Sequence, residues 1–226
     1  MIEILKDIDA VIFDLDGTLL DSMWVWTAID EEYMKKYSLT VPEDFHEGME
    51  GKSYTEVAQY FKDIFPTLSL TREEIMEEWT QMAHEKYVTE VPLKKGARAF
   101  LNMIKAFGIK TGIATSNTKK LVTDTLGALG IDAMFDSVRT SCEVAAGKPS
   151  PDVYLLVAKD LEVEPCRCLV FEDVPMGILA GKNAGMTVCA VKDDFSEIQR
   201  EKKRKLADYY IDNYDEIQNG TYEVLS

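Results

Sequence analysis

The chain has 226 residues, 46% of them hydrophobic, which is enough for one large core and a smaller second domain. Its 25 basic and 40 acidic residues leave a net charge of −15, so we expect neither nucleic acid nor an anionic membrane as a partner. The four cysteines form no paired CxxC pattern, and no stretch has the length of a membrane span or the form of a secretion signal. These features predict a cytoplasmic protein with reduced thiols.

The first predicted strand is the apolar run Ala10-Val11-Ile12, which leads into two acids one residue apart, Asp14 and Asp16. Gly17 can supply a turn directly after them. Neighbouring carboxylates repel each other, so keeping both ionised requires a cation, most simply a hard divalent metal. An Asp-Gly turn with two unused charges is the alternative interpretation.

Residues 19–90 then follow a helical pattern. Apolar side chains at helical spacing mark one face of the first helix: Trp26, Ile29, Tyr33 and Tyr37. Two pairs with capping-box spacing predict the starts of two more helices: Ser53 with Glu56, and Thr71 with Glu74. The pattern therefore predicts a separate helical segment between the first strand and the rest of the chain.

From residue 93 on, predicted helices alternate with predicted strands. The helices span residues 96–107, 119–129 and 151–160, and the strands span residues 110–116, 136–140, 168–172, 187–191 and 208–211. This alternation predicts crossover connections and a parallel sheet with helices on both faces. Because the carboxyl ends of parallel strands meet at one edge, we expect Asp14, Thr115 and Asp173 to converge there.

The second predicted strand ends in polar side chains. Thr115, Ser116 and Asn117 offer hydrogen-bond donors to an anion, ahead of a helix that begins near Thr118.

Two further motifs carry charge. Lys148 comes just before Ser150, which we interpret as a helix N-cap, with Pro151 at the first helical position. Glu172 and Asp173 end another apolar strand and add acids to the expected site.

In this order and spacing, four groups resemble the four motifs of the haloacid dehalogenase superfamily: Asp14-Leu15-Asp16-Gly17-Thr18, Thr115-Ser116-Asn117, Lys148-Pro149 and Glu172-Asp173. The resemblance spans essentially the whole chain and includes a helical insert after the first motif, as in the β-phosphoglucomutase-like branch of small phosphatases and mutases. It implies an α/β fold, with a doubly wound, mainly parallel Rossmann-like sheet in residues 1–18 and 91–226. An all-helical cap domain, residues 19–90, would be inserted after the first strand.

The resemblance also implies roles for the motif residues. Asp14 would be the nucleophile that forms an aspartyl-phosphate, and Asp16 the general acid that later activates water as a base. Mg²⁺ is the expected cofactor, with Asp14, Asp16 and Asp173 as its ligands. Glu172 would either bind the metal directly or orient a metal-bound water, and both alternatives remain open. The residues expected to bind phosphate are Thr115, Ser116, Asn117 and Lys148.

We therefore predict a Mg²⁺-dependent phosphatase of the haloacid dehalogenase type, which hydrolyses a small phosphorylated metabolite, with a sugar phosphate as the favoured class. A β-phosphoglucomutase-like mutase is the alternative. The mutase pattern has Thr and His where Ser22 and Trp26 stand, and Lys and Arg where Glu50 and Tyr54 stand. These differences favour a phosphatase. A non-catalytic binding protein is a further alternative, against which the presence of all the motif acids argues.

Three other residues are candidates for substrate specificity: Gly51, Lys52 and Ser22. The resemblance implies that the loop with Gly51 and Lys52 lies over the core site and contacts the non-reacting end of the substrate, whereas an ordinary surface loop is the alternative. The basic run at residues 200–205 lies beside acids and is interpreted as a solvated helix face. We expect a monomer or a weak homo-oligomer.

Overall fold

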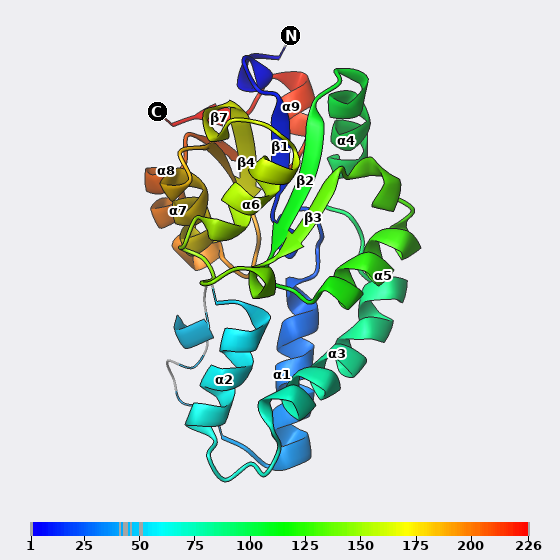
Figure 1. The fold of residues 1–226 in the computed structure, drawn as a ribbon, viewed down its shortest axis with the longest axis vertical. Coiled ribbons are helices and arrows are strands. Elements are labelled where there is room, and N and C mark those ends of the chain that lie inside the picture. Colours follow the sequence, from blue (N-terminus) through cyan, green and yellow to red (C-terminus); the bar gives the residue numbers. More distant parts are fainter. Residues whose placement is uncertain (1, 41, 43–44, 46, 50–51, 226) are drawn as a thin grey trace.

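The fold is seen in a computed structural model, which describes residues 2–40, 42, 45, 47–49 and 52–225. The strands form one sheet in the order β3-β2-β1-β4-β5-β6-β7 (Figure 1). Their bounds are β1 Ala10–Phe13, β2 Lys110–Thr115, β3 Ser137–Thr140, β4 Cys168–Glu172, β5 Thr187–Val191, β6 Tyr209–Ile211 and β7 Glu223–Val224. The pairs from β3 to β6 are parallel, as predicted, whereas β7 is an additional edge strand that pairs antiparallel with β6.

Helices cover both faces of the sheet. Their bounds are α4 Ala97–Ala106, α5 Lys119–Leu129, α6 Asp152–Asp160, α7 Pro175–Asn183, α8 Arg200–Leu206 and α9 Asp215–Asn219. Alternate side chains of β1 enter two hydrophobic clusters, Val11 and Phe13 on the side of α4 and α5, and Ala10 and Ile12 on the side of α6 and α7. This division confirms the doubly wound fold.

One predicted helix start is shifted. Helix α6 begins at Asp152, and Pro151 is its N-cap residue rather than its first helical residue. Ser150 therefore lies one residue too early to cap the helix. The ring of proline fixes φ near its helical value, which is compatible with either position.

Three helices lie against the carboxyl ends of the parallel strands (Figure 1): α1 (Met23–Tyr37), α2 (Tyr54–Ile64) and α3 (Arg72–Thr89). Both predicted capping boxes are present, so Ser53 and Thr71 begin α2 and α3 as expected. The three helices pack through aromatic side chains. Trp79 contacts Tyr33 and Phe61, with ring centroids 5.8 and 5.2 Å apart. We call α1–α3 the three-helix segment.

Two extended linkers connect this segment to the sheet. They pair side by side through an antiparallel bridge between Leu20 and Leu93. Backbone hydrogen bonds from Asp21 to Pro92 (3.0 Å) and from Lys94 to Leu19 (2.9 Å) flank the bridge. The chain therefore enters and leaves the three-helix segment through two linkers that lie side by side.

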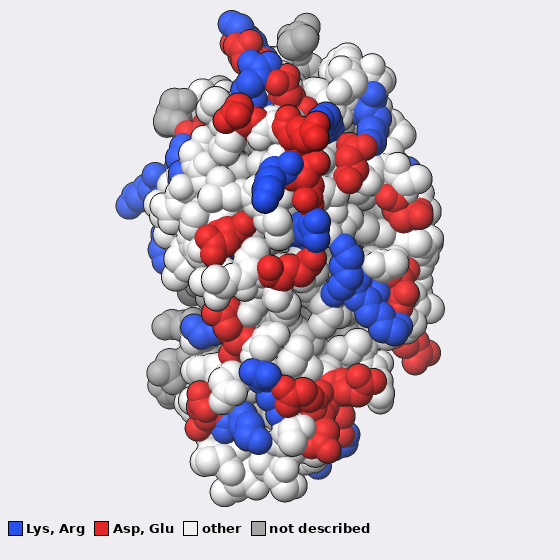
Figure 2. Space-filling view, viewed as in Figure 1, with Lys and Arg blue, Asp and Glu red and all other residues white. Residues whose placement is uncertain are grey.

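Basic and acidic side chains alternate over the face seen in Figure 2. The run at residues 200–205 differs from its prediction as a solvated face at one position, because Lys203 is fully buried. Its Nζ donates to the Val191 carbonyl (3.1 Å) and to Ser196 Oγ (2.9 Å). All four cysteines are free, and no described helix is long and apolar enough to span a membrane.

Candidate active site

Asp14 and Lys148 form a buried ion pair at the carboxyl end of β1. The Asp14 backbone N–H donates to the Phe171 carbonyl (3.0 Å), which continues the sheet pairing to the acid itself. Lys148 Nζ donates to Asp14 Oδ1 at 2.6 Å and to Glu172 Oε1 at 2.5 Å. Burial raises the pKa of Asp14 well above its usual value, and the Lys148 ammonium opposes that rise.

Glu172 is tied into this pair and has little freedom. Its Oε1 also accepts from the Tyr154 hydroxyl (2.6 Å), and its Oε2 accepts from the Asp173 N–H (3.1 Å). A Cβ at Gly177 would lie 1.9 Å from Glu172 Oε1, so α7 approaches closely enough that no larger residue fits there. Tyr154 was not predicted as a site residue, because its spacing on α6 marks only a core position.

Asp173 has a buried carboxylate oxygen without a hydrogen-bond partner. Its Oδ1 accepts from Thr18 Oγ1 (2.9 Å), whereas its Oδ2 is buried without a hydrogen-bond partner. Gly17, with φ +74°, passes close by, and a Cβ there would lie 2.5 Å from Asp173 Oδ2. Burial and the neighbouring Glu172 carboxylate raise the pKa of Asp173 to about 8.

The three acids form a group that suits a metal ion. Asp14, Glu172 and Asp173 each offer one carboxylate oxygen, and these oxygens lie within 4.8 Å of one another. Lys148 compensates only part of their charge. The buried, unpaired Oδ2 of Asp173 and the all-oxygen donor set fit a hard divalent cation such as Mg²⁺.

Asp16 lies beside this group and is held by three donors. Ser22 Oγ (2.7 Å) and the Tyr87 hydroxyl both donate to Oδ1, and Asn117 Nδ2 donates to Oδ2 (3.0 Å). Burial raises the pKa of Asp16, and these three hydrogen bonds oppose that rise. The carboxylate of Asp16 is not in the metal-binding group found among the described residues, so its part in metal binding stays a prediction.

Ser22 and Tyr87 both contact Asp16, a role that the sequence did not predict for either residue. Ser22, a candidate for specificity, is fully buried and bonds to Asp16. Tyr87, which was not predicted as a site residue, reaches Asp16 from α3 with its hydroxyl. The sequence places Tyr87 at a helix position that faces the core, and this position alone does not predict a contact with Asp16.

The remaining predicted residues lie on the loop after β2 and in the three-helix segment. Thr115, Ser116 and Asn117 all line the cavity described below. Helix α5 begins at Lys119, next to the predicted start near Thr118, and its N-cap is Thr118, whose side chain accepts from the Leu121 N–H. Lys52 lines the same cavity, whereas Gly51 lies outside the described residues.

A cavity of about 430 Å³ lies between the sheet edge and the three-helix segment, and it reaches Asp14, Asp16, Lys148 and Asp173. The segment lies directly on the core around it. Tyr54 N donates to the Ser116 carbonyl (3.0 Å), and His84 on α3 pairs with Asp124 on α5 (2.9 Å). The candidate catalytic groups are thus enclosed between two parts of the chain.

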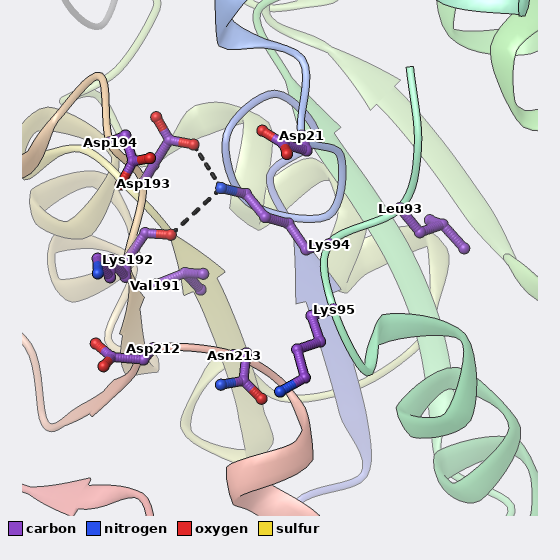
Figure 3. Close-up of a pocket in the computed structure, with 10 residues that line it drawn as sticks. All are labelled: Asp21, Leu93, Lys94, Lys95, Val191, Lys192, Asp193, Asp194, Asp212 and Asn213. Atoms are coloured by element: carbon purple, nitrogen blue, oxygen red, sulfur yellow. Dashed lines mark hydrogen bonds and ion pairs between the residues drawn. The ribbon is translucent and has the colours of Figure 1, made fainter. Parts of the chain in front are cut away.

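A second cavity, of about 260 Å³, lies beside the linkers (Figure 3). Lys94 projects across it and donates to Asp193 (2.5 Å), while the side chains of Asp21 and Lys95 lie at other parts of its wall. Lys94 and Asp193 form an ion pair within this cavity. This cavity therefore anchors a linker to the loop after β5 and lacks the buried, unpaired carboxylate oxygen of the first.

Comparisons with known proteins agree with this geometry. The family model of the haloacid dehalogenase-like hydrolases matches residues 11–191. The chain is 31% identical to a phosphorylated carbohydrates phosphatase of Thermotoga maritima, over 79% of this chain and 82% of that protein. It is 33% identical to hexitol phosphatase A of Escherichia coli, over 80% and 81% respectively.

A solved structure is similar throughout. The crystal structure of β-phosphoglucomutase from Clostridium difficile superposes with a TM-score of 0.76 and 25% identity, covering 95% of this chain and 97% of that one. The motifs, the sheet order and the matched family model agree, and the chain belongs to the haloacid dehalogenase-like hydrolase family.

Proposed function

We propose that the protein is a Mg²⁺-dependent phosphatase that hydrolyses a small phosphorylated metabolite, a sugar phosphate, through an aspartyl-phosphate on Asp14. The observation that carries the proposal is the arrangement of the first cavity. One end of it holds a buried Asp14–Lys148 pair, the partnerless oxygen of Asp173 and an Asp16 held by three donors. The named phosphatases among the relatives support the same reaction class.

In the first step, a carboxylate oxygen of Asp14 forms a bond to phosphorus while the bond between phosphorus and the ester oxygen breaks. Asp16 gives its proton to the departing oxygen, which leaves as an alcohol. Burial raises the pKa of Asp16 above its usual value, and a shift in this direction favours the protonated form that a general acid needs.

In the second step, water attacks phosphorus of the aspartyl-phosphate and Asp16 accepts its proton. Inorganic phosphate and free Asp14 are the products. Ser22, Tyr87 and Asn117 keep the Asp16 carboxylate in one place between the two steps. They are positioning residues, because they act through Asp16.

Lys148 and Thr115 contribute charge and hydrogen bonds to the phosphoryl group. Lys148 is held by Asp14 and Glu172, so its ammonium lies at the reacting carboxylate before a substrate arrives. We assign Glu172 to this positioning of Lys148, since its two oxygens already accept hydrogen bonds from Lys148, Tyr154 and the Asp173 N–H.

Asp14 and Asp173 would hold Mg²⁺, which when bound supplies positive charge against the phosphoryl oxygens. The partnerless Asp173 Oδ2 supports this assignment.

The proposed cap, residues 19–90, would open to admit substrate and close again by motion at the two linkers. Thr55 Oγ1 on α2 lies 3.1 Å from Cys142 Sγ of the core, which allows a direct test. Oxidation of Thr55→Cys to a disulfide with Cys142 is expected to stop multiple turnovers, and reduction is expected to restore them. The same substitution combined with Cys142→Ser is the control. Full turnover by the oxidised, cross-linked protein would contradict the proposal.

A phosphosugar mutase is the second candidate, because the β-phosphoglucomutase structure is similar over nearly the whole chain. One experiment separates the two. The purified protein is incubated with Mg²⁺ or with EDTA and a panel of phosphorylated sugars and other small metabolites, and both free phosphate and isomerised phosphosugar are measured. Free phosphate that requires Mg²⁺ and Asp14 supports the phosphatase, isomer without free phosphate supports the mutase, and metal-independent release contradicts both.

A further inference from the structure

The first cavity has a second end, away from the phosphate site, whose walls are aromatic and aliphatic. Six side chains of the three-helix segment line it: Trp26, Ile29, Tyr54, Val57, Phe61 and Trp79. The cavity as a whole thus joins an ionic end to an apolar end. A ligand that fills it must have the same division.

The aromatic wall is preformed. Tyr54, Phe61 and Trp79 are each at least nine-tenths buried, and their rings pack edge to face. The centroids of Tyr54 and Trp79 are 6.0 Å apart at 70°, and those of Phe61 and Trp79 are 5.2 Å apart at 89°. The Tyr54 hydroxyl bonds to the Met76 carbonyl (3.2 Å) on α3, so this residue offers mainly its ring to a ligand.

Trp26 connects the aromatic wall to the reacting groups. It is only partly buried, and its ring lies 6.0 Å from that of Tyr54 and 5.8 Å from that of Tyr87. Tyr87 in turn bonds to Asp16. Only the Tyr87 side chain therefore separates the Trp26 ring from Asp16, the proposed general acid. The Trp26 ring lies close to where the alcohol part of a substrate would leave.

The opposite wall is also apolar. Phe195 and Ile198, on the loop after β5, line the same cavity and are 51% and 96% exposed. Apolar side chains this exposed beside a cavity gain most when a ligand covers them. Ser196 Oγ donates to the Asp173 carbonyl (2.8 Å), which holds this loop beside the phosphate site. Residues of the loop and of the three-helix segment line the same cavity.

Polar side chains are scarce in the apolar end. Beyond the phosphate site, the polar side chains of the described lining are Thr27, Asp30, Lys52, Ser196 and Gln199, and Ser196 Oγ already donates to the Asp173 carbonyl. The hydroxyls of a bare polyol would lose water there, and each buried hydroxyl without a partner costs on the order of 1–3 kcal/mol. A flat ring instead gains from burial and from offset or edge-on contact with the aromatic wall.

Resting on the proposed phosphatase function, we propose that the natural substrate is a sugar phosphate that carries a planar aromatic ring, the chemical class of the nucleoside 5′-monophosphates. The phosphate lies at Asp14 and the ring lies between Trp26 and the Phe195–Ile198 loop. The sugar spans the two ends.

Matched substrates test this inference. Uridine and adenosine 5′-monophosphate share a primary phosphate ester with methyl β-ribofuranoside 5-phosphate, which carries a methoxy group in place of the base. We expect kcat/KM to be at least about ten-fold higher with the base present, the size of one aromatic contact plus its burial. Equal or faster turnover of the methyl riboside phosphate would overturn the inference and leave the phosphatase function intact.

Binding gives a readout that does not depend on turnover. Calorimetric titration of the Asp14→Asn protein is expected to show about ten-fold tighter binding of the nucleotides than of the methyl riboside phosphate. If no phosphate ester is hydrolysed by the wild-type protein, the proposed function fails, while this titration still decides the inference. Equal affinities for the three compounds would contradict it.

Variants of two tryptophans on the same helix locate the ring. Trp26→Leu is expected to reduce the preference for the nucleotides about three- to ten-fold, measured as the ratio of kcat/KM values within the one variant, so that a general loss of activity cancels. Trp26→Phe should restore most of it. Trp24, 40% exposed and bonded to the Asp21 carbonyl, is outside the lining, and Trp24→Leu should leave the ratio unchanged. Equal effects of Trp26→Leu and Trp24→Leu would overturn the assignment.

Discussion

The two ends of the first cavity are held by different forces. At the sheet edge, Asp14, Asp16 and Lys148 are each held by hydrogen bonds to named partners, and those partners are themselves buried. In the three-helix segment, side chains such as Phe61 and Trp79 are held by packing alone. A buried ionic group is destabilised most when it loses the partner of opposite charge, whereas packed rings tolerate a change of shape. The sheet edge should therefore determine whether a reaction occurs, and the three-helix segment which substrate reacts.

The largest effect is expected from Asp14→Asn. The amide cannot act as the nucleophile, so turnover should fall by at least about 10³-fold. Turnover should fall by the same factor for substrates with and without an aromatic ring, whereas substitutions in the aromatic wall should affect the two kinds of substrate differently. The rate of phosphate release measures the loss of turnover. Circular dichroism checks that the variant still folds, because Lys148 loses one of its two carboxylate partners. Residual full activity would contradict the mechanism.

Lys148→Met is expected to damage stability as well as activity. It leaves the buried carboxylates of Asp14 and Glu172 without their shared cation, which costs about 3–5 kcal/mol in comparable ion pairs. Denaturant unfolding in EDTA measures the loss. The matched control is Lys105→Met, which removes a partly exposed pair with Asp136 and should cost less than about 1 kcal/mol. Similar losses in the two variants would show that the ion pair at the sheet edge is not special.

Much of the sheet edge was predictable from the sequence. Apolar strands that end in Asp14, Thr115 and Glu172-Asp173 can be recognised individually, and parallel pairing brings their ends together. The order of the helices from 97 to 160 follows from hydrophobic spacing in the same way. Strand β7, two residues long, leaves no periodic pattern to detect.

Contacts made across the cavity were not predictable. Tyr87 lies 71 residues after Asp16 in the chain, and their hydrogen bond depends on how α3 lies on the sheet edge. Hydrophobic periodicity indicates which face of a helix is buried, but not which polar group that face contacts. Lys148 shows the same limit, because the sequence predicted contact with phosphate and did not reveal its bonds to Asp14 and Glu172.

Metal binding should depend on pH through Asp173. Its pKa in the folded, metal-free protein is about 8, above the usual 3.8, so the folded state binds a proton that the unfolded state releases. The stability that this proton contributes is fully present below about pH 4 and is lost as pH rises toward 8. Mg²⁺ must displace the proton, and its stabilising effect should therefore be larger at about pH 8 than at about pH 6.

Thermal unfolding with Mg²⁺ and with EDTA measures this effect. Saturation at about 100 times Kd adds about 2.7 kcal/mol, a rise in melting temperature of roughly 5–10 °C for a chain of this size. Asp173→Asn should remove the rise at both pH values. A wild-type protein with no Mg²⁺-dependent rise at either pH would contradict the assignment of the metal site to Asp173.

The smallest effect is expected where the two ends meet. Tyr87 belongs to the three-helix segment but donates to Asp16 Oδ1, and this hydrogen bond lowers the pKa of Asp16. In Tyr87→Phe, Ser22 and Asn117 still hold the carboxylate, so kcat should fall only about 2- to 10-fold, the value of one hydrogen bond. Loss of the donor raises the pKa of Asp16, and the part of the pH–rate profile that requires ionised Asp16 should move to higher pH.

The matched control is Tyr37→Phe, which removes a hydroxyl that bonds to Glu78 at 2.8 and 2.7 Å within the three-helix segment. It should leave the pH–rate profile in place, because Tyr37 has no contact with Asp16 in the described hydrogen bonds. A shift in Tyr87→Phe alone would show that the segment adjusts the proton affinity of Asp16 as well as the choice of substrate. If the pH–rate profiles of both variants superpose on that of the wild type, the Tyr87 hydroxyl does not affect the proton affinity of Asp16. The groups that determine the chemistry would then all lie at the sheet edge.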